Sequence, residues 1–140
     1  MTTSCIACVK KALLQLAILA CLLETPLVQA QMLSAGYDHT CVIDAGGGVQ
    51  CWGSNSSGQL GNGSFGDRLV PVRVKSLDSG VIAVAATSPD RSCALRSNGE
   101  VLCWGNNARG ELGDGTTTTR WVPTRVAGLG PGSGVTAITL

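Results

Sequence analysis

The stretch CVIDAGGGVQCWGSNSSGQL, from Cys41 to Leu60, decides the fold because the chain contains it twice. The second copy, CALRSNGEVLCWGNNARGEL, runs from Cys93 to Leu112, and each shared position lies 52 residues from its counterpart. The copies share a first Cys, a Cys-Trp-Gly triplet and later Asn, Gly and Leu residues. A period of this size is typical of propellers and solenoids, in which each repeat buries its apolar face against the next.

The repeat resembles a known family. The runs HTCVIDAGGGVQCWGSNSSGQLGNG (39–63) and RSCALRSNGEVLCWGNNARGELGDG (91–115), each followed by Arg and then Pro-x-x-Val, are similar to the regulator of chromosome condensation repeat. They most resemble its secreted bacterial form, which has Cys-Trp-Gly at this position. The resemblance implies an all-β fold, a seven-bladed β-propeller with four antiparallel strands in each blade. This chain would hold about two of those blades.

The expected division of the chain follows the repeat. It consists of a signal peptide at 1–30, a first repeat at 31–80, a second repeat at 81–134 and the start of a third at 135–140.

Apolar runs and turn signals place the strands. The expected strands are 31–35, 40–43, 49–52 and 71–74 in the first blade, and 81–86, 93–96, 101–104 and 123–126 in the second. Asn98-Gly99 is a strong hairpin signal. Pro71 and Pro123 are expected to open the outer strands, since the first residue of a strand can lack an N–H.

The first 30 residues have the features of a secretory signal. Lys10 and Lys11 precede an apolar run at 12–23, and Val28-Gln29-Ala30 provides small residues for cleavage before Gln31. The apolar run is too short for a comfortable membrane span. We therefore expect a secreted or periplasmic protein.

A lipoprotein signal is the alternative interpretation of the leader. Ile18-Leu19-Ala20-Cys21 loosely resembles a lipobox, which would make Cys21 a lipidated N-terminus anchored at a membrane. Leu19 is an unfavourable residue at its position in that motif.

Charge argues against two classes of partner. The chain has ten Lys and Arg and nine Asp and Glu, and eight of each remain once the leader residues Lys10, Lys11 and Glu24 are removed. No basic patch indicates nucleic acid and no polybasic run indicates anionic lipid.

The mature segment has four cysteines, two in each repeat. Cys41 and Cys51, like Cys93 and Cys103, flank a hairpin turn with nine residues between them. Directly opposed residues of an antiparallel pair have Cβ atoms about 4.5–5.5 Å apart, within reach of a disulfide. Zinc sites need closer cysteine spacing and usually His, and the chain has one His. The sequence therefore predicts Cys41–Cys51 and Cys93–Cys103 disulfides and no metal.

Aromatic and apolar residues that recur in both repeats indicate packing between blades. Trp52 and Trp104 follow the second cysteine of each repeat, and Leu60 and Leu112 also recur. A stacking platform for sugar or peptide is the alternative for the tryptophans. Recurrence favours packing.

Two unrepeated residues are candidates for binding. Trp121 has Leu69 as its counterpart, so the blade fold does not require an aromatic ring there. His39 is the single histidine, and a general-base role would suit it. Its counterpart is Arg91 and no nucleophile motif lies near it, which favours an exposed position at the start of a strand.

The sequence predicts a secreted, non-catalytic β-propeller repeat protein that binds another protein or an extracellular ligand and needs no cofactor. The alternatives are a guanine-nucleotide exchange factor-like regulator and, by family analogy, a secreted propeller-type enzyme inhibitor. Export, paired cysteines and neutral charge argue against the exchange factor. No converging acid, base and nucleophile indicates an enzyme.

The segment 135–140 has the apolar pattern of an inner strand. Two repeats cannot close a ring that needs about four to eight blades. We therefore expect that the chain is a fragment of a longer protein. The alternatives are that copies self-associate through Val135 to Leu140, or that this segment folds back on the first blade.

The leader generates a prediction about the mature N-terminus. Intact-mass and N-terminal sequencing of the exported protein should show a chain beginning at Gln31, because cleavage is expected after Ala30. A diacylated N-terminal Cys21 would instead establish the lipoprotein interpretation.

Overall fold

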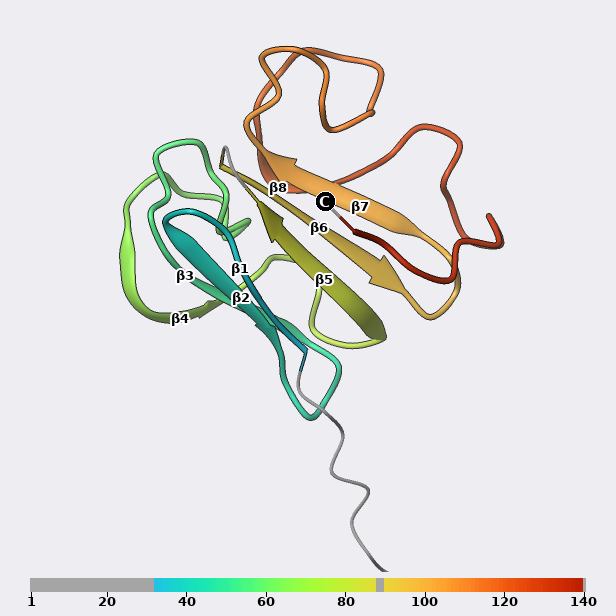
Figure 1. Ribbon diagram of the computed structural model, residues 1–140, viewed down its shortest axis with the longest axis horizontal. Helices are drawn as coiled ribbons and strands as arrows, with labels where there is room; N and C mark the ends of the chain where they lie inside the picture. Colours follow the sequence, from blue (N-terminus) through green and yellow to red (C-terminus); the bar gives the residue numbers. More distant parts are fainter. Residues whose placement is uncertain (1–31, 88–89, 140) are drawn as a thin grey trace, which may run out of the picture. The chain divides into compact units, whose positions relative to one another are not determined.

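The structure is a computed structural model that describes residues 32–87 and 90–139. Within these residues the chain forms two four-stranded antiparallel sheets and no helix, so none of it is a helix that could cross a membrane (Figure 1). The expected all-β fold with four-stranded blades is confirmed. The predicted signal peptide, its cleavage site and Cys21 lie outside the described residues.

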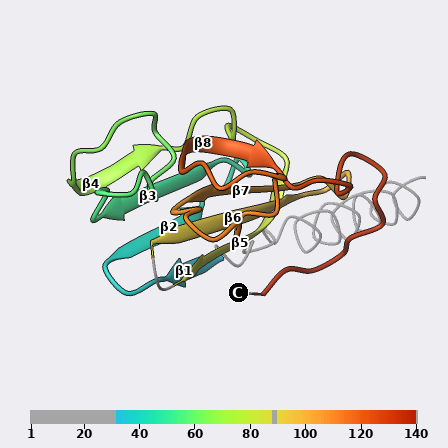
Figure 2. The ribbon, with the colours of Figure 1, turned by 90° about the horizontal axis from the view of Figure 1, so that it is seen from above.

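Both sheets pair their strands in sequence order. The first blade consists of β1 (Leu33–Ala35), β2 (His39–Ile43), β3 (Val49–Gly53) and β4 (Arg68–Arg73). The second consists of β5 (Val81–Thr87), β6 (Arg91–Arg96), β7 (Val101–Gly105) and β8 (Arg120–Arg125). The inner strands β1 and β5 lie at one edge of the two sheets, and the outer strands β4 and β8 lie at the other (Figure 2).

Strand alternation gives each blade a face that carries its cysteines. Successive side chains of a strand point to opposite faces, so alternate residues of β2 and β3 share one side of the sheet. We call this the Cys face. It contains Cys41, Ile43, Val49 and Cys51 in the first blade and Cys93, Leu95, Val101 and Cys103 in the second.

The main core lies between the two blades. The Cys face of the first blade shares one apolar cluster with Val84, Ala94 and Trp104 from the second. Leu60 and Val74 also belong to this cluster and are fully buried. Each fully buried side chain of this size contributes about 1.5–3 kcal/mol relative to exposure. Burial in this core therefore holds one blade against the other.

The segment 135–139 covers part of the Cys face of the second blade. Val135 and Ile138 pack against the cluster that contains Cys93 and Leu95, although the segment forms no strand. Because the link after the second repeat is two residues longer than the link after the first, Val135 and Ile138 correspond to Val81 and Val84, which pack on the first blade. The segment thus reproduces the contact of an inner strand without forming a strand, and it packs on the second blade and not on the first.

The prolines of the outer strands lie inside the strands, so the prediction that they open them is wrong. Pro71 lies within β4 and Pro123 within β8. The register of each pair shifts where the third and fourth strands meet, between Cys51 and Gly53 in the first blade. A residue without an N–H is tolerated at such a bulge on an edge strand because no ladder hydrogen bond is required there.

Each disulfide lies within a single hairpin. Cys41 pairs with Cys51 and Cys93 with Cys103, across directly opposed positions of adjacent strands. The two Cα atoms are 4.1 Å apart in both pairs. These are the pairings that the hairpin register predicts.

The disulfides generate a stability prediction. Replacing Cys41 and Cys51 together by Ala should lower the free energy of unfolding by about 2–3 kcal/mol, since the closed loop is short. Urea denaturation followed by circular dichroism measures this loss.

The second disulfide provides a matched comparison. Cys93 and Cys103 are separated by the same 10 positions, so the loop-closure contribution is equal. An unchanged free energy of unfolding in both double variants would contradict the prediction. A difference between the variants would measure packing around each disulfide.

Candidate binding surface at the blade junction

A buried asparagine shapes the long loop between β3 and β4. The Asn55 side chain is fully buried, and its Oδ1 accepts a hydrogen bond from the Leu60 N–H at 3.0 Å. Its Nδ2 donates to the carbonyl oxygens of Ser64 and Gly66, at 2.7 and 3.2 Å. One side chain therefore satisfies three backbone groups and fixes the path of the loop.

Asn107 does the same in the second blade. Its Oδ1 accepts from the Leu112 N–H at 2.9 Å, and its Nδ2 donates to the Thr116 and Thr118 carbonyls at 3.0 Å each. Asn recurs at this position in the sequence, but no role was predicted for it. Its identity in two loops that otherwise differ was the available signal.

The second loop is further braced by an ion pair. Arg120 Nε lies 2.6 Å from Asp114 Oδ2. Hydrogen bonding from Thr116 and the Arg120 guanidinium lower the pKa of Asp114 to about 2. The first loop has Asn62 in place of Asp114, and Arg68 instead donates to the Asp67 carbonyl oxygen at 3.3 Å.

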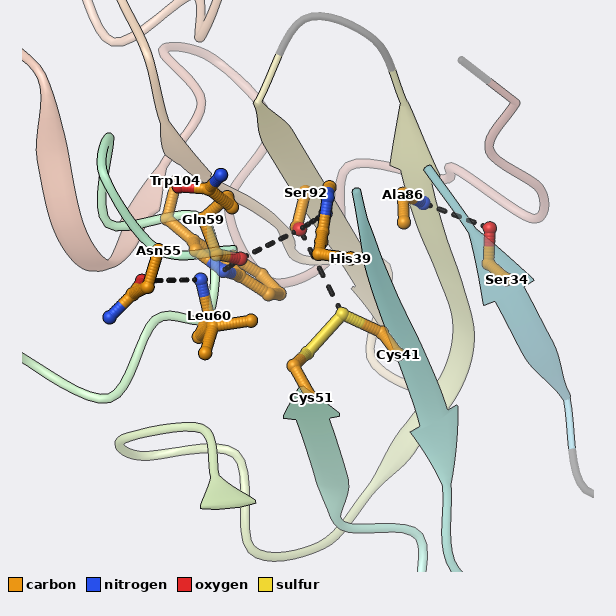
Figure 3. The surroundings of a disulfide bond; sticks show 10 residues. All are labelled: Ser34, His39, Cys41, Cys51, Asn55, Gln59, Leu60, Ala86, Ser92 and Trp104. Carbon is orange, nitrogen blue, oxygen red and sulfur yellow. Dashed lines mark hydrogen bonds between the residues drawn. A yellow bond between two sulfur atoms is a disulfide. The ribbon is translucent and has the colours of Figure 1, made fainter. Parts of the chain in front are cut away.

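The carbonyl of Gln59 joins the two blades. It accepts a hydrogen bond from Trp104 Nε1 at 2.8 Å and another from Ser92 Oγ at 2.9 Å (Figure 3). The Gln59 side chain is also buried, and its Nε2 donates to Asp90 Oδ1 at 3.1 Å. We call this set of contacts between the loop of the first blade and the second blade the seam.

The two repeated tryptophans have different environments. Trp104 is fully buried in the cluster between the blades and belongs to the seam. Trp52 lies on the opposite side of β3 from Cys51 and is half-buried. Leu60 and Leu112 are both buried, each beside the Cys face of its own blade.

His39 is buried in the seam, so its expected exposed position is wrong. Its side chain is 3% exposed, and Nε2 lies 2.8 Å from Ser92 Oγ. The ring fits because Gly36 has no side chain, since a Cβ there would lie 2.6 Å from His39 Cε1. The sequence could not show this, because Gly36 and Ser92 approach His39 only in the folded chain.

Burial lowers the pKa of His39 below 6.5. The nearby Asp90 carboxylate, the backbone carbonyl of Arg91 and the Asp38 carboxylate act in the opposite direction, and burial outweighs them.

The pairing of His39 with Ser92 does not activate a nucleophile. The Gln59 carbonyl has no proton, so Ser92 must donate its own proton to it. His39 Nε2 therefore carries a proton and donates to Ser92, which is the reverse of what a general base does. Among the described residues no cluster of three or more His, Cys, Asp or Glu side chains could hold a metal ion.

Two unrepeated aromatic residues meet at the surface above the seam. The ring centroids of Phe65 and Trp121 are 4.1 Å apart in an edge-to-face arrangement. The residues are 49% and 44% exposed. Phe65 comes from the loop of the first blade and Trp121 from β8 of the second. We call these two residues the aromatic pair.

The loop of the first blade holds Trp121 in place. The Gly63 N–H donates to the Trp121 carbonyl at 2.9 Å. Gly58 lies directly beneath the indole, because a Cβ on Gly58 would lie 2.7 Å from Trp121 Cδ1 and 2.9 Å from its Cα. Trp121 was a binding candidate from the sequence. Phe65 was missed, although its counterpart Thr117 marks it as equally unrepeated.

The surface also has exposed apolar residues on the outer strands and basic residues at the loop of the first blade. The outer strands expose Leu69, Val70 and Val122. Lys75 lies against Gly63, and Arg68 donates to Ser64 Oγ beside Phe65. Neither cation has a carboxylate partner within 4.0 Å among the described residues.

Comparisons with family models agree with the repeat. Models of the Regulator of chromosome condensation (RCC1) repeat match residues 33–59 and 81–111, and residues 98–139. The first model matches part of each of the two repeats, and the second matches the later part of the second repeat and the start of the third.

The chain is similar to parts of much longer proteins. It is 33% identical to the Ultraviolet-B receptor UVR8 of Arabidopsis thaliana over 74% of this chain and 23% of that protein. It is 37% identical to the Probable E3 ubiquitin-protein ligase HERC4 of Homo sapiens over 86% of this chain and 11% of that protein. The chain thus spans between a tenth and a quarter of these relatives.

Solved structures show the same fold. Human WBSCR16 matches with a TM-score of 0.60 and 26% identity, over 68% of this chain and 24% of that one. Prp20p from Saccharomyces cerevisiae matches with a TM-score of 0.55 and 31% identity, over the same shares of the two chains.

The contact beneath Trp121 generates a prediction. Gly58→Ala should displace Trp121, because the new Cβ would meet the indole and its backbone at less than 3 Å. The indole N–H resonance of Trp121, assigned by its loss in Trp121→Phe, should move.

Gly115→Ala is the matched control. Gly58 and Gly115 have φ of 75° and 80°, so alanine costs about 1–2 kcal/mol of backbone strain at either position. A Cβ on Gly115 meets nothing within 4 Å. Equal losses of stability and an unmoved Trp121 resonance in both variants would show that the Gly58 contact does not position the indole.

Proposed function

Because the chain belongs to the Regulator of chromosome condensation (RCC1) repeat family, we propose that it is an exported, non-catalytic propeller-repeat module that binds another protein. The observation that carries this proposal is the aromatic pair, in which two half-exposed rings from different blades are held together at the surface. Relatives with this repeat make a binding or regulatory propeller the general expectation.

Two features support export. The leader has a basic start, an apolar run and a small-residue cleavage site. The four cysteines of the two blades form disulfides, which persist in oxidising compartments and are rare in the cytosol.

The properties of the aromatic pair favour a protein partner. Exposed tryptophan is enriched among residues that dominate protein interfaces, and its rigid ring loses little conformational entropy on binding. Phe65 and Gly58 already hold Trp121, so less ordering is needed when a partner arrives. Lys75 and Arg68 nearby would suit a partner that presents a carboxylate beside an apolar side chain.

Binding by related propellers is consistent with this proposal. Prp20p is described by its binding properties to Gsp1p and histones, and a second structure holds Kap60 bound to yeast RCC1. An exported protein would meet other partners than these relatives do. We therefore extend only protein binding, as a class of function, from the relatives to this chain.

Photo-crosslinking tests the proposal. A photoreactive phenylalanine analogue at position 65 should give a protein adduct in the extracytoplasmic fraction of the source cells. The same analogue at Tyr37, which is 81% exposed in the turn between β1 and β2, is the matched control and should give none. The adduct would be identified by mass spectrometry.

The purified adduct partner then allows affinity measurements. Trp121→Ala should weaken its binding about tenfold or more, whereas Tyr37→Ala should leave it unchanged. Equal adducts at both positions, or an affinity that does not depend on Trp121, would rule out the aromatic pair as the binding surface.

A further inference from the structure

The face of the first blade that points away from the second blade is apolar. Strand alternation puts Thr40, Val42 and Trp52 on the side opposite the Cys face, and Leu33 opposes Val42 across β1 and β2. Leu33 is 62% exposed and Trp52 is half-buried. Neither belongs to an apolar cluster of the described residues. We call these four residues the open face.

The same positions in the second blade are buried where the two blades meet. By strand register, the counterparts of the open face are Val84, Ser92, Ala94 and Trp104. Val84 is 5% exposed and Trp104 is fully buried, whereas Leu33 at the position of Val84 is mostly exposed. The open face therefore has the composition of a surface that packs on a Cys face, but no described residue of the chain covers it in that way.

The open face also has the hydrogen-bond donors of a seam. In the seam between the two blades, Trp104 Nε1 and Ser92 Oγ donate to the Gln59 carbonyl (Figure 3). Their counterparts, Trp52 Nε1 and Thr40 Oγ1, donate to no group in the part of the chain that the structure describes. Two donors of the same kind and spacing are thus unused on the first blade.

The second blade has the matching acceptor. The carbonyl of Glu111 is the counterpart of the Gln59 carbonyl, and the two loops hold it alike. In each loop the Asn Oδ1 accepts the N–H of the same peptide group, at 2.9 Å for Asn107 and 3.0 Å for Asn55. Within residues 32–87 and 90–139, nothing donates to the Glu111 carbonyl. Each blade therefore holds one half of a second seam.

Charges at these two halves are complementary. In the existing seam His39 of the first blade lies near the Asp90 carboxylate of the second. The counterpart of His39 is Arg91 on the second blade, and the counterpart of Asp90 is Asp38 on the first. If the open face of a second copy took the place of a following blade, its Asp38 would lie near Arg91. Opposite charges at matching places favour this register over others.

The Cys face of the second blade is covered by a segment that is weakly held. Ile138 packs there and is half-buried. The segment 135–139 forms no strand, and its one hydrogen bond among the described residues is from the Val135 N–H to Ser133 Oγ at 3.4 Å. Ile138 corresponds to Val84, which is also the position of Leu33 in strand register. An incoming Leu33 would replace Ile138 without breaking a strand ladder.

We propose that the open face of one copy binds the Cys face of the second blade of another copy, so that Thr40 and Trp52 of one donate to the Glu111 carbonyl of the other. The contact joins two different surfaces, so it repeats head to tail until a ring closes. A ring of about four to eight blades corresponds to about two to four copies of these two blades. The segment 135–139 is displaced in this assembly and does not form the contact.

One position of the second seam differs from the first and limits its strength. Gln59 Nε2 donates to Asp90 Oδ1 at 3.1 Å. At the second seam Glu111 would bring a carboxylate to Asp38 of the other copy. Arg91 lies 3.7 Å from Glu111 and offsets part of this repulsion. Binding between copies is therefore weaker than it would be with an amide at position 111.

Sedimentation velocity of the purified chain tests for the assembly. The mass should rise from one chain to two or more between micromolar and near-millimolar concentration. Leu33→Lys should abolish this rise, because it puts a charge into an apolar contact. Leu69→Lys is the matched control, since it makes the same change at a residue of β4 that is 95% exposed. A mass that stays at one chain, or equal effects of the two variants, would overturn the proposal and leave another protein or a further repeat as the occupant.

A substitution at position 111 tests the seam by strengthening it. Glu111→Gln should tighten the association about two- to fivefold, because it removes a partly exposed like-charge contact and restores the amide found at Gln59. Asp78→Asn removes one negative charge at an exposed position of the link between the blades and should leave the association unchanged. Unchanged or weaker association in Glu111→Gln would contradict the proposed contact.

Nuclear magnetic resonance identifies the surface that copies use. The indole N–H resonance of Trp52, assigned by its loss in Trp52→Phe, should shift as the concentration rises, and that of Trp121 should not. Trp52→Phe keeps an aromatic ring without the donor and should weaken association about three- to tenfold. Association with an unmoved Trp52 resonance would overturn the proposal. If Trp121 moved in its place, copies would associate through the aromatic pair.

Discussion

The carbonyl oxygen of Gln59 is the constraint on which the arrangement of the two blades depends. Apolar burial between the blades is large but has no direction, so it does not fix how one sheet is placed on the other. Hydrogen bonds from Trp104 and Ser92 to a single oxygen supply that direction. Both donors are fully buried, so each would cost about 1–3 kcal/mol if left unpaired. Asn55 brings the carbonyl to this position by fixing the loop that carries it.

The repeated parts of the fold could be predicted from the sequence, because they are determined by local patterns. Alternation and the 52-residue period placed β2, β3, β6 and β7 to within one or two residues and identified the opposed cysteines. The prolines were misplaced because the bulges that accommodate them depend on pairing between strands. The burial of His39 and the place of Phe65 in the aromatic pair were not predicted for a related reason. Their environments are formed by Ser92 and Trp121, which are far away in the sequence.

The candidate site illustrates how a repeat architecture acquires specificity. Residues that recur, such as Asn55 and Asn107, satisfy the backbone of each loop and give both blades the same form. Residues that do not recur, such as Phe65 and Trp121, lie on the surface of this shared backbone structure and leave it unchanged. Their meeting between blades means that neither blade has the surface by itself.

The placement of the disulfides within single blades has consequences for oxidative folding and for the evolution of repeat number. Each disulfide closes a hairpin within one blade and joins residues separated by 10 positions. Short loops close quickly, so the correct cysteine partner is the nearest one during oxidation and mispairing between blades is disfavoured. A blade can therefore oxidise as soon as its own hairpin has formed, before its neighbour has folded. Duplication or loss of a whole blade would likewise leave each cysteine of the remaining blades with its partner, so that ring size could vary in evolution without leaving an unpaired thiol in any blade.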